Sequence, residues 1–184
     1  MKPTKTRKII LCALFAALTA VLSQLVIPIG PVPINMATLA VFCAGGLLGS
    51  RFGALSLVIW AVLGLAGVPV FALFRSGPEA LAGSTGGFIV GYIPAAFITG
   101  LITERLNKGN RISTYAVAML TGMFTYFSLG TAWFMYLTNS ELWAALLVCV
   151  LPFLPGDFLK IAAASVLVKR LRHTSASHLL AQTF

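Results

Sequence analysis

The chain has 184 residues, of which 59% are hydrophobic and only 9% are charged. A soluble domain carries roughly 25% charged residues, so this chain has too few charged groups to cover a water-exposed surface. Composition excludes a soluble globule, a disordered chain and a coiled coil, and the mean hydropathy of +0.96 indicates a polytopic membrane protein.

Six apolar segments are candidates for membrane-spanning helices, each of which needs about 20 apolar residues. We predict spans over residues 9–27, 34–50, 54–74, 86–103, 113–137 and 142–168. A polar stretch, 75–85, separates the third span from the fourth. In the last segment, Pro152, Pro155 and Gly156 predict a break that precedes the final helix. The expected architecture is a single all-α membrane domain over residues 1–184, built as a six-helix bundle.

The basic residues predict how the bundle lies in the membrane. Eleven of the 13 Lys and Arg residues fall at the two termini or in the loops after the second and fourth spans. Arg75 falls in a loop on the other side, and Lys160 lies within a span. Because cytoplasmic loops are enriched in Lys and Arg, we expect both termini in the cytoplasm. The net charge of +9 does not indicate nucleic-acid binding, since the basic residues form no polar face with interleaved aromatics.

Several classes of site lack the residues that they need. Cys12, Cys43 and Cys149 are scattered through apolar runs and are expected to be buried thiols. The histidines, His173 and His178, both lie in the C-terminal tail, so no metal site is expected. The chain has no Gly-x-x-x-x-Gly-Lys-Ser/Thr loop and no catalytic Ser, His and Asp set in its spans. We therefore expect neither an ATPase nor another enzyme.

Asp157 and Lys160 are the most informative residues, because they are charged groups inside an apolar segment. They are three positions apart and share a helix face, and burying either charge costs roughly 3 kcal/mol. One interpretation is a mutually neutralising pair that only fixes the helix. The other is a pair that faces an outward-open cavity for a small polar ligand. The break before the pair favours the cavity, since interrupted membrane helices usually line cavities.

Further polar groups are expected near the same level of the membrane. Asn35 and Thr38 lie just inside the second span, and Arg75 and Glu79 lie in the outer loop. Arg75 could attract an anionic ligand, or it could pair with Glu79 four residues later.

The first span carries Ala13 and Ala17, four residues apart. Small residues at this spacing permit the close approach by which helices associate in lipid. The first helix is otherwise bulky and would lie at the periphery of a six-helix bundle. Its alanines could therefore receive another protein, or they could be internal packing.

Five segments of the chain carry a resemblance to a known family. They are Ile-Pro-Ile-Gly-Pro-Val-Pro-Ile at 27–34, Leu-Leu-Gly-Ser-Arg-Phe-Gly-Ala at 47–54, Gly-Leu-Ala-Gly-Val-Pro-Val-Phe at 64–71, Gly-Ser-Thr-Gly-Gly-Phe at 83–88, and Leu-Pro-Phe-Leu-Pro-Gly-Asp-Phe-Leu-Lys at 151–160. The chain resembles the BioY family, the biotin-specific substrate-binding components of energy-coupling-factor (ECF) transporters. The last segment matches the family's Pro-Gly-Asp-x-x-Lys signature in full. Ala37, Arg75, Ser84 and Phe88 depart from the residues usual in the family.

The resemblance implies a multi-pass protein of a prokaryotic cytoplasmic membrane that binds biotin with high affinity and without covalent chemistry. Its implied partners are a membrane coupling subunit and two cytoplasmic ATPases, and biotin is its transported ligand with no other cofactor. Transport would require the whole subunit to reorient in the membrane. The alternatives are a binder for another small vitamin, a membrane enzyme or a structural subunit.

The resemblance also assigns roles to residues. The family's Asp and Lys map onto Asp157 and Lys160, and its Ala-x-x-x-Ala docking motif maps onto Ala13 and Ala17. Asp157 can accept from the ureido group of biotin, while either Lys160 or Arg75 can pair with its carboxylate. The candidate binding residues are Asp157, Lys160, Arg75, Asn35, Thr85 and Tyr92.

Overall fold

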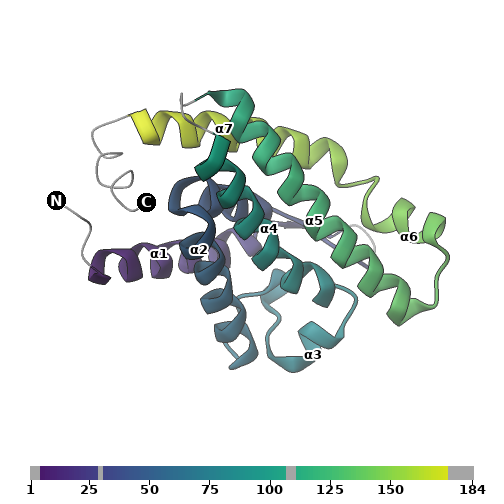
Figure 1. Ribbon diagram of the computed structural model, residues 1–184. Helices are drawn as coiled ribbons and strands as arrows, with labels where there is room; N and C mark the ends of the chain where they lie inside the picture. The colour runs from purple at the N-terminus through teal and green to yellow at the C-terminus, as the bar shows by residue number, and fades with distance from the viewer. Residues whose placement is uncertain (1–4, 29–30, 107–110, 174–184) are drawn as a thin grey trace.

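The computed structural model describes residues 5–28, 31–106 and 111–173, most of which are helical (Figure 1). Residues 174–184, which include His178, lie outside the described residues, whereas His173 is the last residue of a helix. The elements are α1 (Lys5–Ser23), β1 (Val26–Ile27), β2 (Ile34–Asn35), α2 (Ala37–Leu65), η1 (Ala72–Phe74), α3 (Gly77–Ala82), α4 (Gly86–Leu106), α5 (Ile112–Thr138), α6 (Leu142–Cys149) and α7 (Leu154–His173).

Within the described residues, four helices are long and apolar enough to cross a membrane: α1, α2, α4 and α5. The pair α6 and α7 makes a fifth if it is counted as one bent span. The described residues are thus mostly helical and include four to five candidate membrane spans, which agrees with the predicted helical membrane class. The six predicted spans do not correspond to six separate helices, however, because the second and third, 34–50 and 54–74, both fall largely within α2.

α2 is not a straight rod. Gly49 has φ 81° and ψ −174°, a conformation that glycine adopts readily and that strains other residues. A Cβ added to Gly53 would lie 3.0 Å from the carbonyl oxygen of Ala44, although residues nine apart on a straight helix are about 13.5 Å apart. The chain therefore turns sharply at Gly49, and the helical turns on its two sides contact each other. This turn explains why the single element α2 contains two of the predicted apolar spans.

The apolar run of the first predicted span is longer than the helix that it forms. α1 ends at Ser23 instead of residue 27, and the next residues pair in antiparallel fashion, Val26 with Asn35 and Ile27 with Ile34. Prolines at 28, 31 and 33 cannot continue a helix, so β1 and β2 take the place of helical ends.

The third predicted span is also too long, because α2 ends at Leu65. Gly67 has φ 97°, and Pro69 has no N–H to give, so neither continues the helix. Beyond the end of α2, Phe71, Ala72 and Leu73 line a cavity instead of continuing the helix. The polar stretch 75–85, predicted as a loop, contains the short helix α3.

The last span is broken one turn earlier than predicted. α6 ends at Cys149 and α7 begins at Leu154, with a bend of 51° between them. Pro155 and Gly156 therefore lie inside the first turn of α7, not before it. Proline is accepted there because the first N–H groups of a helix have no partner within the helix. Asp157 lies in the same turn, where the helix dipole stabilises a negative charge.

The centre of the molecule is formed by α2, α4 and α5, which pack in that order, while α1 covers α2 and α7 contacts both α2 and α5. Small residues allow the backbones to meet. A Cβ on Gly100 of α4 would lie 2.3 Å from the backbone nitrogen of Ser50, and one on Gly91 would lie 3.1 Å from the Cα of Tyr126. Such close approach stabilises helix pairs in lipid. The three cysteines are buried and unpaired, as predicted.

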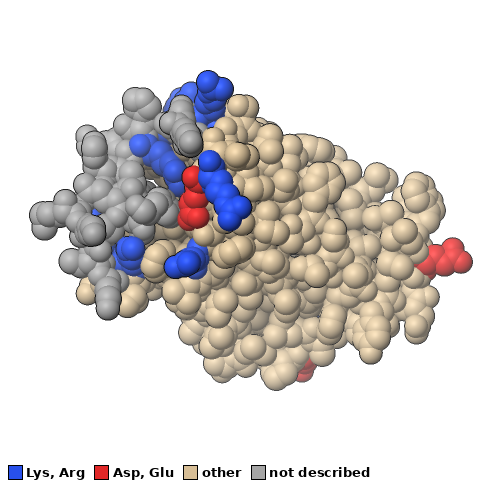
Figure 2. All heavy atoms as spheres, viewed as in Figure 1, with Lys and Arg blue, Asp and Glu red and all other residues tan. Residues whose placement is uncertain are grey.

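Basic residues gather at one end of the molecule. α1 begins and α7 ends at this end (Figure 1), and Figure 2 shows Lys and Arg concentrated there on the face in view. The turn in α2 lies beside the end of α4. There the carboxylate of Glu104 accepts hydrogen bonds from the backbone nitrogen of Ser50 (2.8 Å) and from its hydroxyl (2.9 Å). Lys8 lies over the ring of Phe52 at 4.9 Å.

Candidate binding site

A cavity of about 330 Å³ lies between the helices and the loops that follow α1 and the second half of α2, within the range of small-molecule sites, about 300–1,000 Å³. Its walls come from the β1–β2 ribbon, the 71–75 segment, the turn before α4, and α2, α4, α5 and α7. Much of the lining is aromatic and comes from Trp60, Phe71, Phe88, Tyr92, Tyr126 and Phe153. Such a surface suits the apolar body of a ligand, while a few polar groups fix its orientation.

The buried pair Asp157 and Lys160 contributes to the wall of this cavity. Nζ of Lys160 lies 2.8 Å from Oδ1 of Asp157, and the two residues are only 6% and 1% exposed. Nζ also donates to the carbonyl oxygen of Asn35 at 2.7 Å and to the hydroxyl of Thr38 at 3.0 Å. An ammonium has three N–H donors, so these three contacts satisfy Lys160 completely.

The carboxylate of Asp157 is satisfied from three sides. Besides Lys160, the hydroxyl of Thr38 donates to Oδ1 at 3.2 Å, and the hydroxyl of Tyr126 donates to Oδ2. The Tyr126 ring meets Tyr92 edge to face with centroids 5.5 Å apart. Both sequence interpretations therefore describe part of the site: the charges neutralise each other, and they do so at a cavity. Fully satisfied polar networks of this kind hold their members in one geometry.

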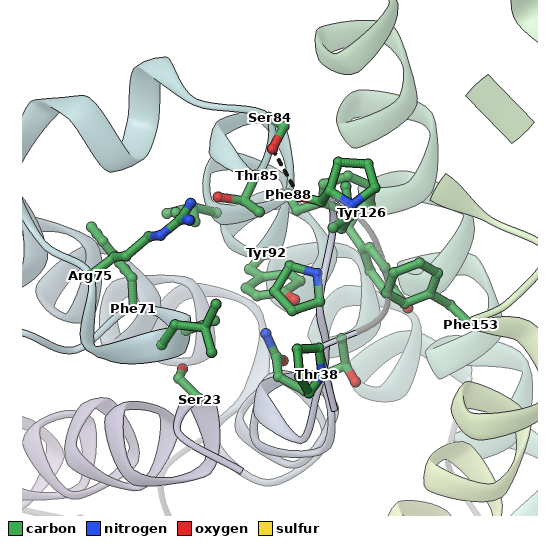
Figure 3. Close-up of a pocket in the computed structure, with 18 of the residues that line it drawn as sticks. Ser23, Thr38, Phe71, Arg75, Ser84, Thr85, Phe88, Tyr92, Tyr126 and Phe153 are labelled. Atoms are coloured by element: carbon green, nitrogen blue, oxygen red, sulfur yellow. Dashed lines mark hydrogen bonds between the residues drawn. The ribbon is translucent and has the colours of Figure 1, made fainter. Parts of the chain in front are cut away.

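All six candidate binding residues line this one cavity. Asn35 lies on β2 just before α2, not inside a helix, and its side-chain oxygen accepts from the Ala37 nitrogen at 3.0 Å. Thr85 lies in the turn before α4, where its carbonyl accepts from the Phe88 nitrogen. Tyr92 lies on α4 in the centre of the close-up in Figure 3.

Arg75 faces the cavity from the opposite side to Phe153 (Figure 3). Among the described residues its side chain makes no hydrogen bond or ion pair, so the predicted alternative of an Arg75–Glu79 pair is not formed. The guanidinium is thus available to an anionic group of a ligand.

Two loops that are far apart in the sequence meet at the cavity. The hydroxyl of Ser84 donates to the carbonyl oxygen of Pro31 at 3.0 Å, and Figure 3 shows this bond as a dashed line. Both residues line the cavity. The contact joins the ribbon-forming loop to the turn before α4, so the two walls hold each other in place.

Sequence reasoning missed several residues of the site. Tyr126 contacts Asp157 directly, and its only sequence signal is a hydroxyl-bearing aromatic within an apolar span. Trp60, Phe71 and Phe153 line the cavity but look like ordinary core residues in the sequence. In the part of the chain that the structure describes, no three His, Cys, Asp or Glu side chains come together as metal ligands.

The predicted docking alanines lie away from the cavity, on the outward face of α1. Ala13 and Ala17 are exposed, whereas Cys12 and Ala16 are buried against the bundle at 0% and 2% exposure. The stripe is therefore not part of the internal packing of α1.

Comparison with known proteins identifies close relatives. A family profile described as the BioY family matches residues 1–177. The chain is 36% identical over 188 residues to the biotin transporter BioY of Rhodobacter capsulatus, with 96% of this chain and 98% of that protein covered. It is 35% identical over 168 residues to the probable biotin transporter BioY of Pyrococcus horikoshii, covering 91% and 98%.

A solved structure is similar over nearly its whole length. The S-component for biotin from an ECF-type ABC transporter superimposes with a TM-score of 0.87 at 28% sequence identity, covering 96% of both chains. The fold of this solved structure thus agrees with the family resemblance that the five sequence segments carry.

Proposed function

Because the chain belongs to the BioY family, we propose that it is a high-affinity biotin-binding membrane subunit of an ECF-type uptake transporter. Its relatives are named as transporters, and it is accordingly a transport protein and not an enzyme. The observation that carries the biotin assignment is the buried Asp157–Lys160 pair in the wall of an aromatic cavity.

The chemistry of biotin matches the polar and apolar parts of this cavity. Biotin has a ureido group with two N–H donors, an apolar bicyclic ring and a carboxylate tail. The carboxylate of Asp157 accepts from a ureido N–H, and Tyr126 beside it supplies a hydroxyl. The aromatic walls cover the bicyclic ring and remove apolar surface from water, which stabilises the complex by about 25 cal/mol per Å² buried.

The carboxylate tail pairs with Arg75 in this proposal. Nζ of Lys160 already donates to three protein oxygens, so it has no N–H left for a ligand. Arg75 lines the cavity, and a guanidinium can bind a carboxylate through two parallel hydrogen bonds. The assignment places the two ends of biotin at opposite sides of the cavity.

The membrane arrangement proposed is six crossings with both termini in the cytoplasm of a prokaryotic cell. It is supported by the sharp turn at Gly49, which divides α2 into two helical halves, and by the pair α6 and α7 when it is taken as one bent span. The gathering of Lys and Arg at the end where α1 begins and α7 ends also supports it. The cavity then opens toward the outside.

The partners proposed are a membrane coupling subunit and two cytoplasmic ATPases, which supply the work of transport. We assign the docking of the coupling subunit to Ala13 and Ala17, whose exposure on α1 supports the assignment. The subunit then reorients as a whole in the membrane to release biotin inside the cell.

Titration calorimetry of the purified protein with biotin, thiamine and riboflavin tests the ligand assignment. We expect one biotin per chain with at least about 1,000-fold preference over the other two vitamins, because a site built to hydrogen-bond one group strongly rejects ligands without it. A preference for thiamine or riboflavin would contradict the biotin assignment and leave the binding-subunit class intact. Formation of a reaction product would contradict both.

Substitution of Arg75 by Gln tests the orientation of the ligand. We expect biotin affinity to fall about 10-fold, equivalent to about 1.4 kcal/mol, while the affinity for biotin carboxamide stays within about twofold of wild type. Glu79→Gln is the matched control, because Glu79 is in the same outer segment and does not line the cavity. An equal loss for both ligands would show that Arg75 does not pair with the carboxylate.

A further inference from the structure

The side chain of Gln24 joins the end of α1 to a wall of the cavity. Its Nε2 donates to the carbonyl oxygens of Phe71 at 3.0 Å and Pro69 at 3.3 Å, and its Oε1 accepts from the backbone nitrogen of Phe74 at 2.9 Å. Nε2 also lies 3.3 Å from the carbonyl oxygen of Ala20 in the last turn of α1. One amide thus uses both its donor and its acceptor groups to bind a segment 45 to 50 residues away.

The segment that Gln24 binds has an unfavourable backbone conformation. Leu73 has φ 61° and Phe74 has φ 56°, in the left-handed region that bulky L-residues rarely occupy. Burial of these side chains does not offset the cost of the conformation, because Leu73 and Phe74 are 46% and 70% exposed. A bond from the Phe71 nitrogen to the Arg75 carbonyl at 3.1 Å closes the segment at its base. The middle of the segment is held by the hydrogen bond from the Phe74 backbone nitrogen to Oε1 of Gln24.

The same segment supplies ligand contacts. Phe71, Leu73 and Arg75 all line the cavity, and Phe71 packs edge to face on Trp60 with centroids 5.1 Å apart. Relaxation of Leu73 and Phe74 to ordinary conformations would shift the chain that leads into Arg75. The position of this wall therefore depends on Gln24, although Gln24 itself does not line the cavity.

We propose that Gln24 is a positioning residue of the binding site, which holds segment 69–75 in its cavity-lining conformation and thereby slows release of the ligand. Because Gln24 directly follows α1, the same hydrogen bonds tie this wall to the end of that helix. The choice of biotin as the probe rests on the proposed function, whereas the hold of Gln24 on the segment does not.

The first test compares wild type with Gln24→Met, which keeps the length of the side chain and removes the amide. We expect biotin release in a stopped-flow experiment to be about 10-fold faster or more, with the association rate within about twofold, since weakened contacts act mainly on release. Hydrogen exchange of amides 70–75 in the ligand-free protein should also be faster. Ser128→Ala is the matched control: it removes an exposed bond to the Phe124 carbonyl outside the cavity and should change neither readout.

The second test is rescue by Phe74→Gly in the Gln24→Met background. Glycine adopts positive φ without steric cost and keeps the backbone nitrogen, and Phe74 does not line the cavity. We expect Phe74→Gly to reverse at least about half of the increase in the logarithm of the biotin release rate that Gln24→Met causes. If Gln24→Met does not fold, Gln24→Glu, which keeps the acceptor and loses the donors, should shift both readouts in the same direction.

The proposal would be overturned if the Gln24 variants released biotin and exchanged amides 70–75 at the wild-type rates. It would also be overturned if Phe74→Gly failed to slow biotin release in the Gln24→Met background. If the wild-type protein binds no biotin, the proposed function fails while the exchange of amides 70–75 still decides the role of Gln24. The two failures are therefore distinguishable.

Discussion

Replacement of Asp157 by Asn together with Lys160 by Met is expected to give a folded protein that has lost biotin binding by about 100-fold or more. The ligand loses a charged acceptor, and hydrogen bonds to charged groups contribute about 1.5–3 kcal/mol each. The fold survives because a buried ion pair can be exchanged for neutral groups at little cost in stability. Titration calorimetry measures the first effect and thermal unfolding in detergent measures the second.

The single variants should behave differently from the double one. Asp157→Asn alone leaves the ammonium of Lys160 buried without its partner, and Lys160→Met alone does the same to the carboxylate. Breaking a buried pair costs about 3–5 kcal/mol, so each single variant should unfold at a lower temperature than the double variant. Glu141→Gln, an exposed residue outside the cavity, is the control for loss of a carboxylate. Wild-type biotin affinity in the double variant would mean that the pair only fixes the helix.

Replacement of Ala13 and Ala17 by Trp is expected to abolish ATP-dependent biotin uptake and co-purification of the coupling subunit. Both alanines are exposed, so the bundle has room for the indole rings and biotin affinity should stay near wild type. An approaching helix has no such room, because helix association in lipid depends on close backbone contact. Uptake into cells that express the full transporter, measured beside calorimetry of the isolated subunit, separates the two effects.

Ala162→Trp provides the matched control, since Ala162 is an exposed alanine on α7, away from the proposed docking face. Uptake by this variant should remain near wild type. Loss of biotin binding in the Ala13 and Ala17 variant would show that the stripe is internal packing. Unchanged uptake in that variant would contradict the docking role itself.

The class of the protein and the charged pair of its candidate site could be predicted from the sequence because both depend on strong local signals. A charge within an apolar run is expensive, so Asp157 and Lys160 stand out in a single sequence. A proline-rich stretch likewise marks the loop that becomes β1 and β2. Local composition is sufficient for features of this kind.

The remaining features depend on contacts between distant residues. Hydropathy cannot distinguish Phe71, which lines the cavity, from a residue that crosses the membrane, so the predicted third span runs nine residues too far. Gly49 is one glycine among 17, and only its φ reveals that the chain turns back there. The contacts of Tyr126 with Asp157, and of Gln24 with Phe74, join residues 31 and 50 positions apart.

The ion pair of Asp157 and Lys160 near the start of α7 has an electrical consequence. Moving one elementary charge through 100 mV of membrane potential changes its energy by about 2.3 kcal/mol. Asp157 and Lys160 lie 2.8 Å apart, so together they would add no net charge to a subunit that reorients as proposed. In the proposed binding mode, with the biotin carboxylate on Arg75, the charges of the loaded site also sum to zero. The voltage across the membrane would then do no net work on the charges of the occupied site.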